Sequence, residues 1–172
     1  MSISELSFLM LFFFILHEFE EIICVRSWIL KNESNPKLKK EMFIAGKSHY
    51  PSTETLSIMI AEELILLAAL LLAAIALGNI EIAIEIFIAY TIRLIFHIFQ
   101  AIQFKKWQPG SRTALIEIAL VLSILIYCFL FVSLNSTTVL IWTFVFLTIL
   151  IANLKLLHFS ANKIEKWRKK LL

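Results

Sequence analysis

The sequence predicts an all-α integral membrane protein, a single helical bundle over residues 1–172 with five transmembrane helices. The first observation is composition, since 60% of the residues are hydrophobic, 17% are charged and the mean hydropathy is +0.86. Soluble domains contain about 45–50% apolar and about 25% charged residues. The second observation is that apolar residues gather into five runs, each long enough to cross roughly 30 Å of hydrocarbon as a helix. Backbone groups must pair internally in lipid, so helices are expected.

The predicted spans are residues 4–25, 56–78, 80–104, 112–134 and 138–160. The first of them differs from a secretory signal sequence. It has no basic segment before the apolar run, it carries Glu5, and no small-residue cleavage site follows it. We therefore expect this segment to be retained as the first helix of the bundle.

The connections between the spans are of two kinds. Gly78-Asn79 and Asn135-Ser136-Thr137 predict tight turns, so the helices on either side of each should be antiparallel neighbours. Residues 26–54 instead form a long polar loop, in which Pro36 could begin a short helix lying on the membrane surface. The predicted bundle therefore has short connections at one end and longer ones at the other.

The third observation is the distribution of positive charge. The 26–54 loop, residues 105–112 and the tail after Asn162 are basic, whereas the two tight turns contain neither Lys nor Arg. Since cytoplasmic loops carry the excess of Lys and Arg, the N-terminus is predicted outside and the C-terminus in the cytoplasm. The basic loop and tail are expected to contact anionic lipid of the bilayer, and no nucleic-acid partner is predicted.

Four ionisable side chains interrupt the first span in the sequence HEFEE, residues 17–21. His17, Glu20 and Glu21 stand at positions i, i+3 and i+4 and share one helical face. By helical rise, His17 lies about 13 Å from the cytoplasmic end of this span. Ionisable residues at such depth face the bundle interior or a wet cavity and are candidates for function. Glu18 falls off this face, so we expect it to contact a neighbouring helix or the loop and leave it out of the site.

Every other span brings polar side chains to the same leaflet. On the third span, Arg93 and His97 lie one turn apart on one face, and Arg93 is expected to form an ion pair between helices. The remaining groups are Glu62 and Glu63 in the second span, Glu117 in the fourth, and Asn153 and His158 in the fifth. Glu85 lies near the outer end of the third span and is left out, because a helix N-terminus favours carboxylates by itself.

An imidazole and carboxylates at one depth form a ligand set for zinc, iron or manganese. The predicted ligands of such a divalent transition metal are His17, Glu20, Glu21, His97, Glu62 and Glu63, of which the first four are also the predicted catalytic residues. A metal would offset the cost of so many buried carboxylates. The alternative is a metal-free set, in which Arg93 pairs with a carboxylate and His17 is an acid, a base or a proton relay.

Three functions fit this polar cluster. The first is a metal-dependent intramembrane enzyme with a lipid substrate, whose reactive group would lie just below the headgroups. The second is a small transporter, or a carrier coupled to protons or ions, that uses the same residues for translocation. The third is a non-catalytic membrane partner whose cluster holds helices together. Little polar continuity in the outer leaflet and the lack of a visible internal repeat count against the transporter.

Three motifs in order resemble those of the HXXEE family of small bacterial membrane proteins. They are HEFEE at residues 17–21, His97 in the third span, and WQPGSRT at residues 107–113, which is similar to the family's aromatic-x-Pro-Gly-x-x-Thr turn. By itself, Pro109-Gly110 is a turn signal, and Thr113 is a candidate N-cap of the fourth span. The resemblance covers most of the chain and implies a multi-pass protein of the inner (cytoplasmic) membrane. It also supports His17, Glu20, Glu21 and His97 as the residues that matter, and it implies no particular reaction.

Overall fold

The computed structural model describes residues 1–35 and 50–171, and within these ranges the chain forms five α-helices and no strand. The all-α prediction is therefore confirmed, whereas the surface helix predicted after Pro36 lies outside the described residues. The helices are α1 (Ile3–Asn32), α2 (Thr53–Leu77), α3 (Ile80–Phe104), α4 (Ser111–Phe131) and α5 (Ser136–Leu171). Each contains one of the predicted spans almost completely, and α1 and α5 continue well beyond theirs.

The helix ends follow local sequence. α1 begins with a capping box, in which the Ser2 hydroxyl accepts from the Glu5 N–H and the Glu5 carboxylate accepts from the Ser2 N–H. α2 ends at Gly78, whose φ of +62° is in the left-handed region that glycine adopts readily. The tight turn predicted at Gly78-Asn79 is thereby confirmed. Before α5, Asn135 Oδ1 accepts hydrogen bonds from the N–H groups of Thr137 and Thr138. The helix therefore begins at Ser136, within the predicted turn of residues 135–137.

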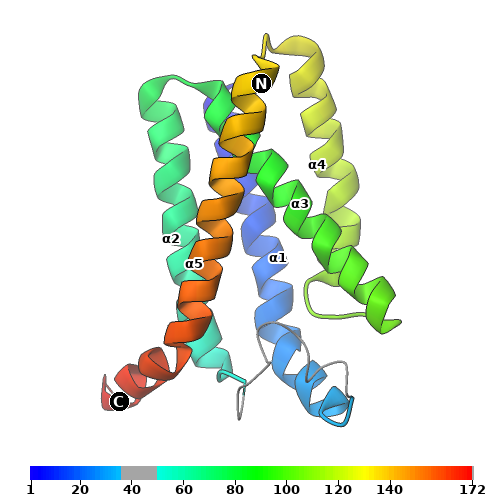
Figure 1. Cartoon of the computed structure of the whole chain (residues 1–172), viewed down its shortest axis with the longest axis vertical. Coiled ribbons are helices and arrows are strands. Elements are labelled where there is room, and N and C mark those ends of the chain that lie inside the picture. The colour runs from blue at the N-terminus through cyan, green and yellow to red at the C-terminus, as the bar shows by residue number, and fades with distance from the viewer. Residues whose placement is uncertain (36–49, 172) are drawn as a thin grey trace.

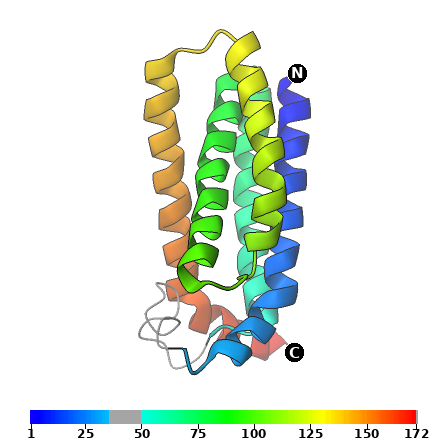
Figure 2. The same ribbon diagram turned by 90° about the vertical axis from the view of Figure 1, so that its right-hand side faces the viewer.

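The helices run up and down along the bundle, and α3 lies at its centre (Figures 1 and 2). α3 packs against each of the other four helices. The expectation that the helices joined at Asn135 are packed neighbours was wrong, because α4 and α5 scarcely touch and both lie against α3 instead. In Figure 2, α3 stands between them. Centrality suits the sequence of α3, since its 80–94 half presents buried residues on most of its faces.

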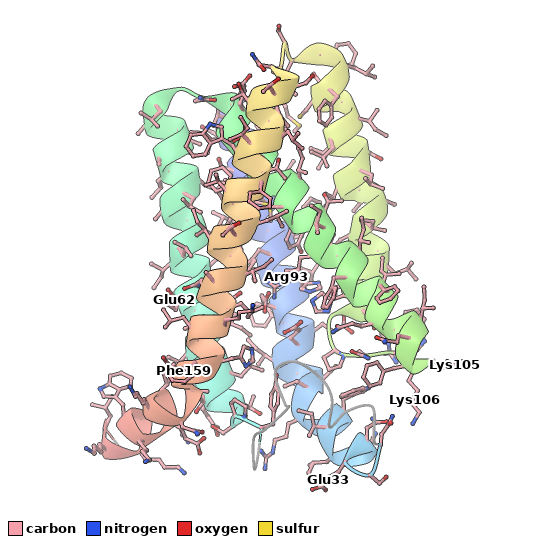
Figure 3. The ribbon with its side chains drawn as sticks, in the orientation of Figure 1. Glu33, Glu62, Arg93, Lys105, Lys106 and Phe159 are labelled. Carbon is pink, nitrogen blue, oxygen red and sulfur yellow. The ribbon has the colours of Figure 1, made fainter. Side chains whose placement is uncertain are left out.

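The two ends of the bundle differ in charge. The N-terminus and the turns at Gly78 and Asn135 lie at one end, and the C-terminus and the basic connection between α3 and α4 lie at the other (Figure 1). We call the latter the basic end, and Lys105 and Lys106 mark it in Figure 3. Lys106 Nζ donates to Asn32 Oδ1 at 3.0 Å, which ties the connection between α3 and α4 to the last turn of α1. The final turns of α5, which carry the basic tail, turn sideways across this end.

The outer surface of the bundle is apolar, as expected of a protein in lipid. Among the described residues, α2, α3, α4 and α5 are long and apolar enough to cross a membrane. α1 is not in that set, because three carboxylates between residues 18 and 21 interrupt its apolar run. Large apolar side chains point outward along the bundle, and examples are Phe8, Ile65, Ile116, Leu140 and Phe144. An apolar exterior of this kind is what a bundle embedded in a membrane requires.

Candidate metal site

α1 presents two residues of the HEFEE sequence to the centre of the bundle. His17 is fully buried, and Glu21 follows one turn later with 19% of its side chain exposed. The helical spacing of four residues places both side chains on one face, as predicted. The distance from His17 Nε2 to the nearer carboxylate oxygen of Glu21 is 3.8 Å.

α3 brings His97 to the same point. Its Nε2 atom lies 3.4 Å from Oε1 of Glu21, and its ring centroid lies 4.7 Å from that of His17, edge to face. His17, Glu21 and His97 each offer one donor atom, and these atoms all lie within 4.8 Å of one another. We call these three residues the His/Glu group. Of the described residues, they alone form a cluster of at least three metal-ligating side chains with this spacing.

The turn between α3 and α4 closes over the His/Glu group. Gly110 is the N-cap of α4 and has φ of +80°, a conformation that favours glycine. A Cβ atom at this position would lie 3.0 Å from Glu21 Oε1, 3.0 Å from His17 Nε2 and 3.0 Å from His97 Nδ1. The absent side chain of Gly110 therefore leaves room beside one ring or carboxylate atom of each member of the His/Glu group.

Glu20 faces a different partner. Its Oε2 atom accepts two hydrogen bonds from Thr113, one from the backbone N–H and one from the hydroxyl, each 2.7 Å long. Thr113 was predicted as the N-cap of the fourth span, which was wrong because Gly110 occupies that position. Glu20 of α1 instead satisfies a free N–H group at the first turn of α4, where the helix dipole also favours a carboxylate.

Arg93 joins three helices close to the His/Glu group. It forms ion pairs with Glu18 of α1 and with Glu63 of α2, the latter at 3.3 Å. The predicted interhelical ion pair of Arg93 is thus confirmed. Glu18 is 2% exposed and pairs with this guanidinium. Its carboxylate is therefore buried in the polar centre of the bundle, although the site predicted from the sequence omits Glu18. Figure 3 places Arg93 in the middle of the bundle.

The structure does not bring the other predicted ligands into the His/Glu group. Glu20 bonds Thr113 and Glu63 bonds Arg93, as described above. Glu62 is more exposed and accepts a hydrogen bond of 2.9 Å from Asn153 of α5. Each of these three carboxylates stabilises a contact between helices.

Glu117 and Glu85 are two further buried carboxyl groups. Glu117 accepts a 2.6 Å hydrogen bond from the hydroxyl of Tyr90, which links α4 to α3. Glu85 is fully buried, and neither carboxyl oxygen has a hydrogen-bond partner among the described residues. Both lie outside the His/Glu group.

A cavity of about 510 Å³ adjoins the His/Glu group. Residues of α1, α2, α3 and α5 line it, and most of them are apolar, including Phe14, Leu67 and Leu147. Glu21 and His97 form part of its polar wall, together with Arg93 and Glu63. Its volume is in the usual range for small-molecule sites, which are apolar with a few convergent polar groups.

The donor set of the His/Glu group fits a divalent transition metal. Two imidazoles and one carboxylate form the three-ligand set of catalytic zinc sites and of non-haem iron sites, both of which keep further positions open. His17 Nε2 is buried and has no hydrogen-bond partner among the described residues, so its lone pair can be given to an ion. Three carboxylates, of Glu18, Glu21 and Glu63, interact with the guanidinium of Arg93, and a cation would offset part of that excess of negative charge.

Sequence reasoning missed three residues of this centre, Glu18, Gly110 and Thr113. The Pro-Gly turn and Thr113 were visible as part of a motif, and their order in the chain was a usable signal. Their position against α1 is a tertiary feature, separated from His17 by more than ninety residues. Nothing in the local pattern around Gly110 shows that a bare Cα must face the His/Glu group.

Comparison with known proteins finds a matching family. The model of a family described as "Protein of unknown function with HXXEE motif" matches residues 8–126. No curated protein and no solved structure matches the chain. The matched residues contain the whole His/Glu group and the turn with Gly110 and Thr113. The match covers more than half of the chain, and the chain therefore belongs to the HXXEE family.

Proposed function

We propose that this protein is a metal-dependent integral membrane enzyme that acts on a lipid. The observation that carries the proposal is the convergence of three donor atoms within 4.8 Å at the wall of an apolar cavity inside a membrane bundle. His17, Glu21 and His97 would hold the ion, which we expect to be zinc, iron or manganese. Three protein ligands favour catalysis over a structural role, because structural zinc sites are closed by four.

The bound ion would supply Lewis-acid chemistry, by polarising a water molecule or a substrate oxygen. The protein's own part is to orient the reacting group and to exclude bulk water. Glu21 and His97 line the cavity, whereas His17 is fully buried and is not part of its lining. Substrate would therefore meet the site from the cavity, on the side of Glu21 and His97.

The surroundings of the site favour a lipid as substrate. The cavity is bounded by apolar side chains such as Phe14, Met59 and Leu150, which suit an acyl or isoprenoid chain. Its polar wall lies toward the basic end of the bundle. An amphipathic molecule could thus place its chain in the cavity and its polar group beside the His/Glu group.

The orientation and location belong to the same proposal. The basic end would face the cytoplasm, with the N-terminus outside and all five helices in the cytoplasmic membrane. The last turns of α5 carry Arg168, Lys169 and Lys170 and would lie on anionic lipid headgroups. This placement sets the His/Glu group in the cytoplasmic half of the bilayer.

The proposal is tested by lipid turnover in vesicles. Purified protein is reconstituted with a total lipid extract, and lipid products are identified by mass spectrometry. We expect products that disappear on chelation, return on addition of one transition metal, and are absent with His17→Ala. Leu147→Trp, which fills the cavity from α5, should also remove activity, whereas Leu140→Trp on the exposed face of the same helix should not. Unchanged lipid with metal-loaded protein under all conditions would contradict the proposal.

A further inference from the structure

We infer that Thr113 and Glu20 are positioning residues for the metal site, which hold the His17 ring in one tautomer with Nε2 directed at the ion. This inference rests on the proposed metal site, and it assigns to Glu20 a role other than that of a ligand. It also makes the first turn of α4 part of the support of the site.

The hydrogen bonds around Thr113 determine the tautomer of His17. The hydroxyl of Thr113 has one hydrogen atom and can therefore donate once. Three acceptors are within reach, namely Glu20 Oε2 at 2.7 Å, the Gly110 carbonyl at 3.1 Å and His17 Nδ1 at 3.1 Å. A carboxylate is the strongest acceptor of the three and forms the shortest bond, so the hydroxyl hydrogen belongs to Glu20.

His17 Nδ1 must then be the donor in its contact with Thr113. With Nδ1 protonated, a neutral imidazole has its free lone pair on Nε2. That atom faces the space in front of Gly110, at 3.8 Å from Glu21 Oε1, and has no other partner among the described residues. The proton therefore lies on the side away from the proposed ion position.

The arrangement has the usual form of a support for a metal-binding histidine. Such a histidine donates its second ring N–H to a carboxylate or another acceptor, which fixes the orientation of the ring. Here the Thr113 hydroxyl is placed between the imidazole and the carboxylate of Glu20. The backbone N–H of Thr113 also donates to that carboxylate, so the first turn of α4 fixes the position of the Glu20 side chain.

The test compares three variants by Co²⁺ titration in detergent, followed by visible absorption. Thr113→Val removes the hydroxyl and keeps the side-chain shape, Thr113→Ser restores the hydroxyl, and Thr91→Val is the matched control. The Thr91 hydroxyl is buried, and it donates to the carbonyl of Phe87 within its own helix. We expect Thr113→Val to weaken Co²⁺ binding roughly 10–100-fold and to change the spectrum. Thr113→Ser and Thr91→Val should bind as the wild type does.

A second readout does not depend on metal. The ring ¹⁵N chemical shifts of His17 in metal-free protein should show the Nδ1-protonated tautomer in the wild type and a mixture in Thr113→Val. Wild-type-like Co²⁺ affinity in Thr113→Val, or an Nε2-protonated His17 in the wild type, would overturn the inference. A wild type that binds no Co²⁺ but shows the expected tautomer would overturn the proposed metal site and leave the hydrogen-bond assignment standing.

Discussion

Glu20 of α1 receives both the backbone N–H and the hydroxyl of Thr113 in the first turn of α4, at 2.7 Å each. This contact joins the HEFEE sequence to the turn of residues 107–113, which follows it by some ninety positions. The two motifs are therefore parts of one structural unit. The HEFEE sequence contributes His17 and Glu21 to the His/Glu group, and its Glu20 caps the first turn of α4. The turn of residues 107–113 contributes Gly110, which faces the His/Glu group.

Gly110→Ala should prevent metal binding while every ligand stays in the chain. The new methyl group would lie 3.0 Å from an atom of each member of the His/Glu group and would crowd the side chains that are proposed to hold the ion. Metal content is measured by mass spectrometry of the purified protein. We expect a large loss relative to the wild type.

Gly78→Ala is the control for the backbone strain of that change. Gly78 also has positive φ, +62°, and a Cβ there would meet nothing within 4 Å. Both substitutions place alanine in the left-handed region, which costs roughly 1–2 kcal/mol. Equal metal content in both variants would show that Gly110 does not border the ion.

Arg93→Ala should destabilise the protein strongly. It leaves Glu18 buried without its cation and also removes the partner of Glu63. Removing one member of a buried ion pair typically costs about 3–5 kcal/mol. The midpoint of thermal unfolding in detergent should fall well below that of Lys169→Ala, which breaks the ion pair between the exposed Lys169 and Glu165. Similar midpoints for the two variants would mean that the Arg93 network contributes little to the bundle.

Glu85→Gln separates the enzyme from the carrier that the sequence left open. Glu85 is fully buried and lacks a hydrogen-bond partner among the described residues, so removing its charge should not lower stability. It lies outside the His/Glu group, and metal content should stay at the wild-type level. If Glu85 belonged to an ion pathway, vesicles that contain Glu85→Gln would take up less metal than vesicles that contain the wild-type protein. That result would favour the carrier.

Much of the fold was predictable because lipid imposes a simple pattern on sequence. Apolar runs of sufficient length located all five helices. The spacing of four residues placed His17 and Glu21 on one helical face. His97 was predictable as their partner from its depth, since α1 and α3 both run toward the basic end. Depth along the bundle axis can be counted in residues.

Counting residues does not give the rotation of each helix about its own axis, nor which helices pack against each other. Glu18 points to Arg93 because of how α1 is turned against α3, and one-dimensional spacing leaves that choice open. The separation of α4 from α5 has the same origin, since a short turn fixes direction without fixing contact. Gly110 and Thr113 lie in the site through the path of a loop, which depends on the finished arrangement of three helices.

The central claim is that His17, Glu21 and His97 bind a metal ion, and elemental analysis tests it most directly. The wild type, His17→Ala and Glu62→Gln are purified identically without chelator or metal-affinity steps and measured for transition metals. Glu62 was a predicted ligand from the sequence, but it bonds Asn153 outside the His/Glu group, so it is the matched control. The account predicts about one ion per chain in the wild type and in Glu62→Gln, and little in His17→Ala. A wild type without metal, or a His17→Ala variant that retains it in full, would contradict the account.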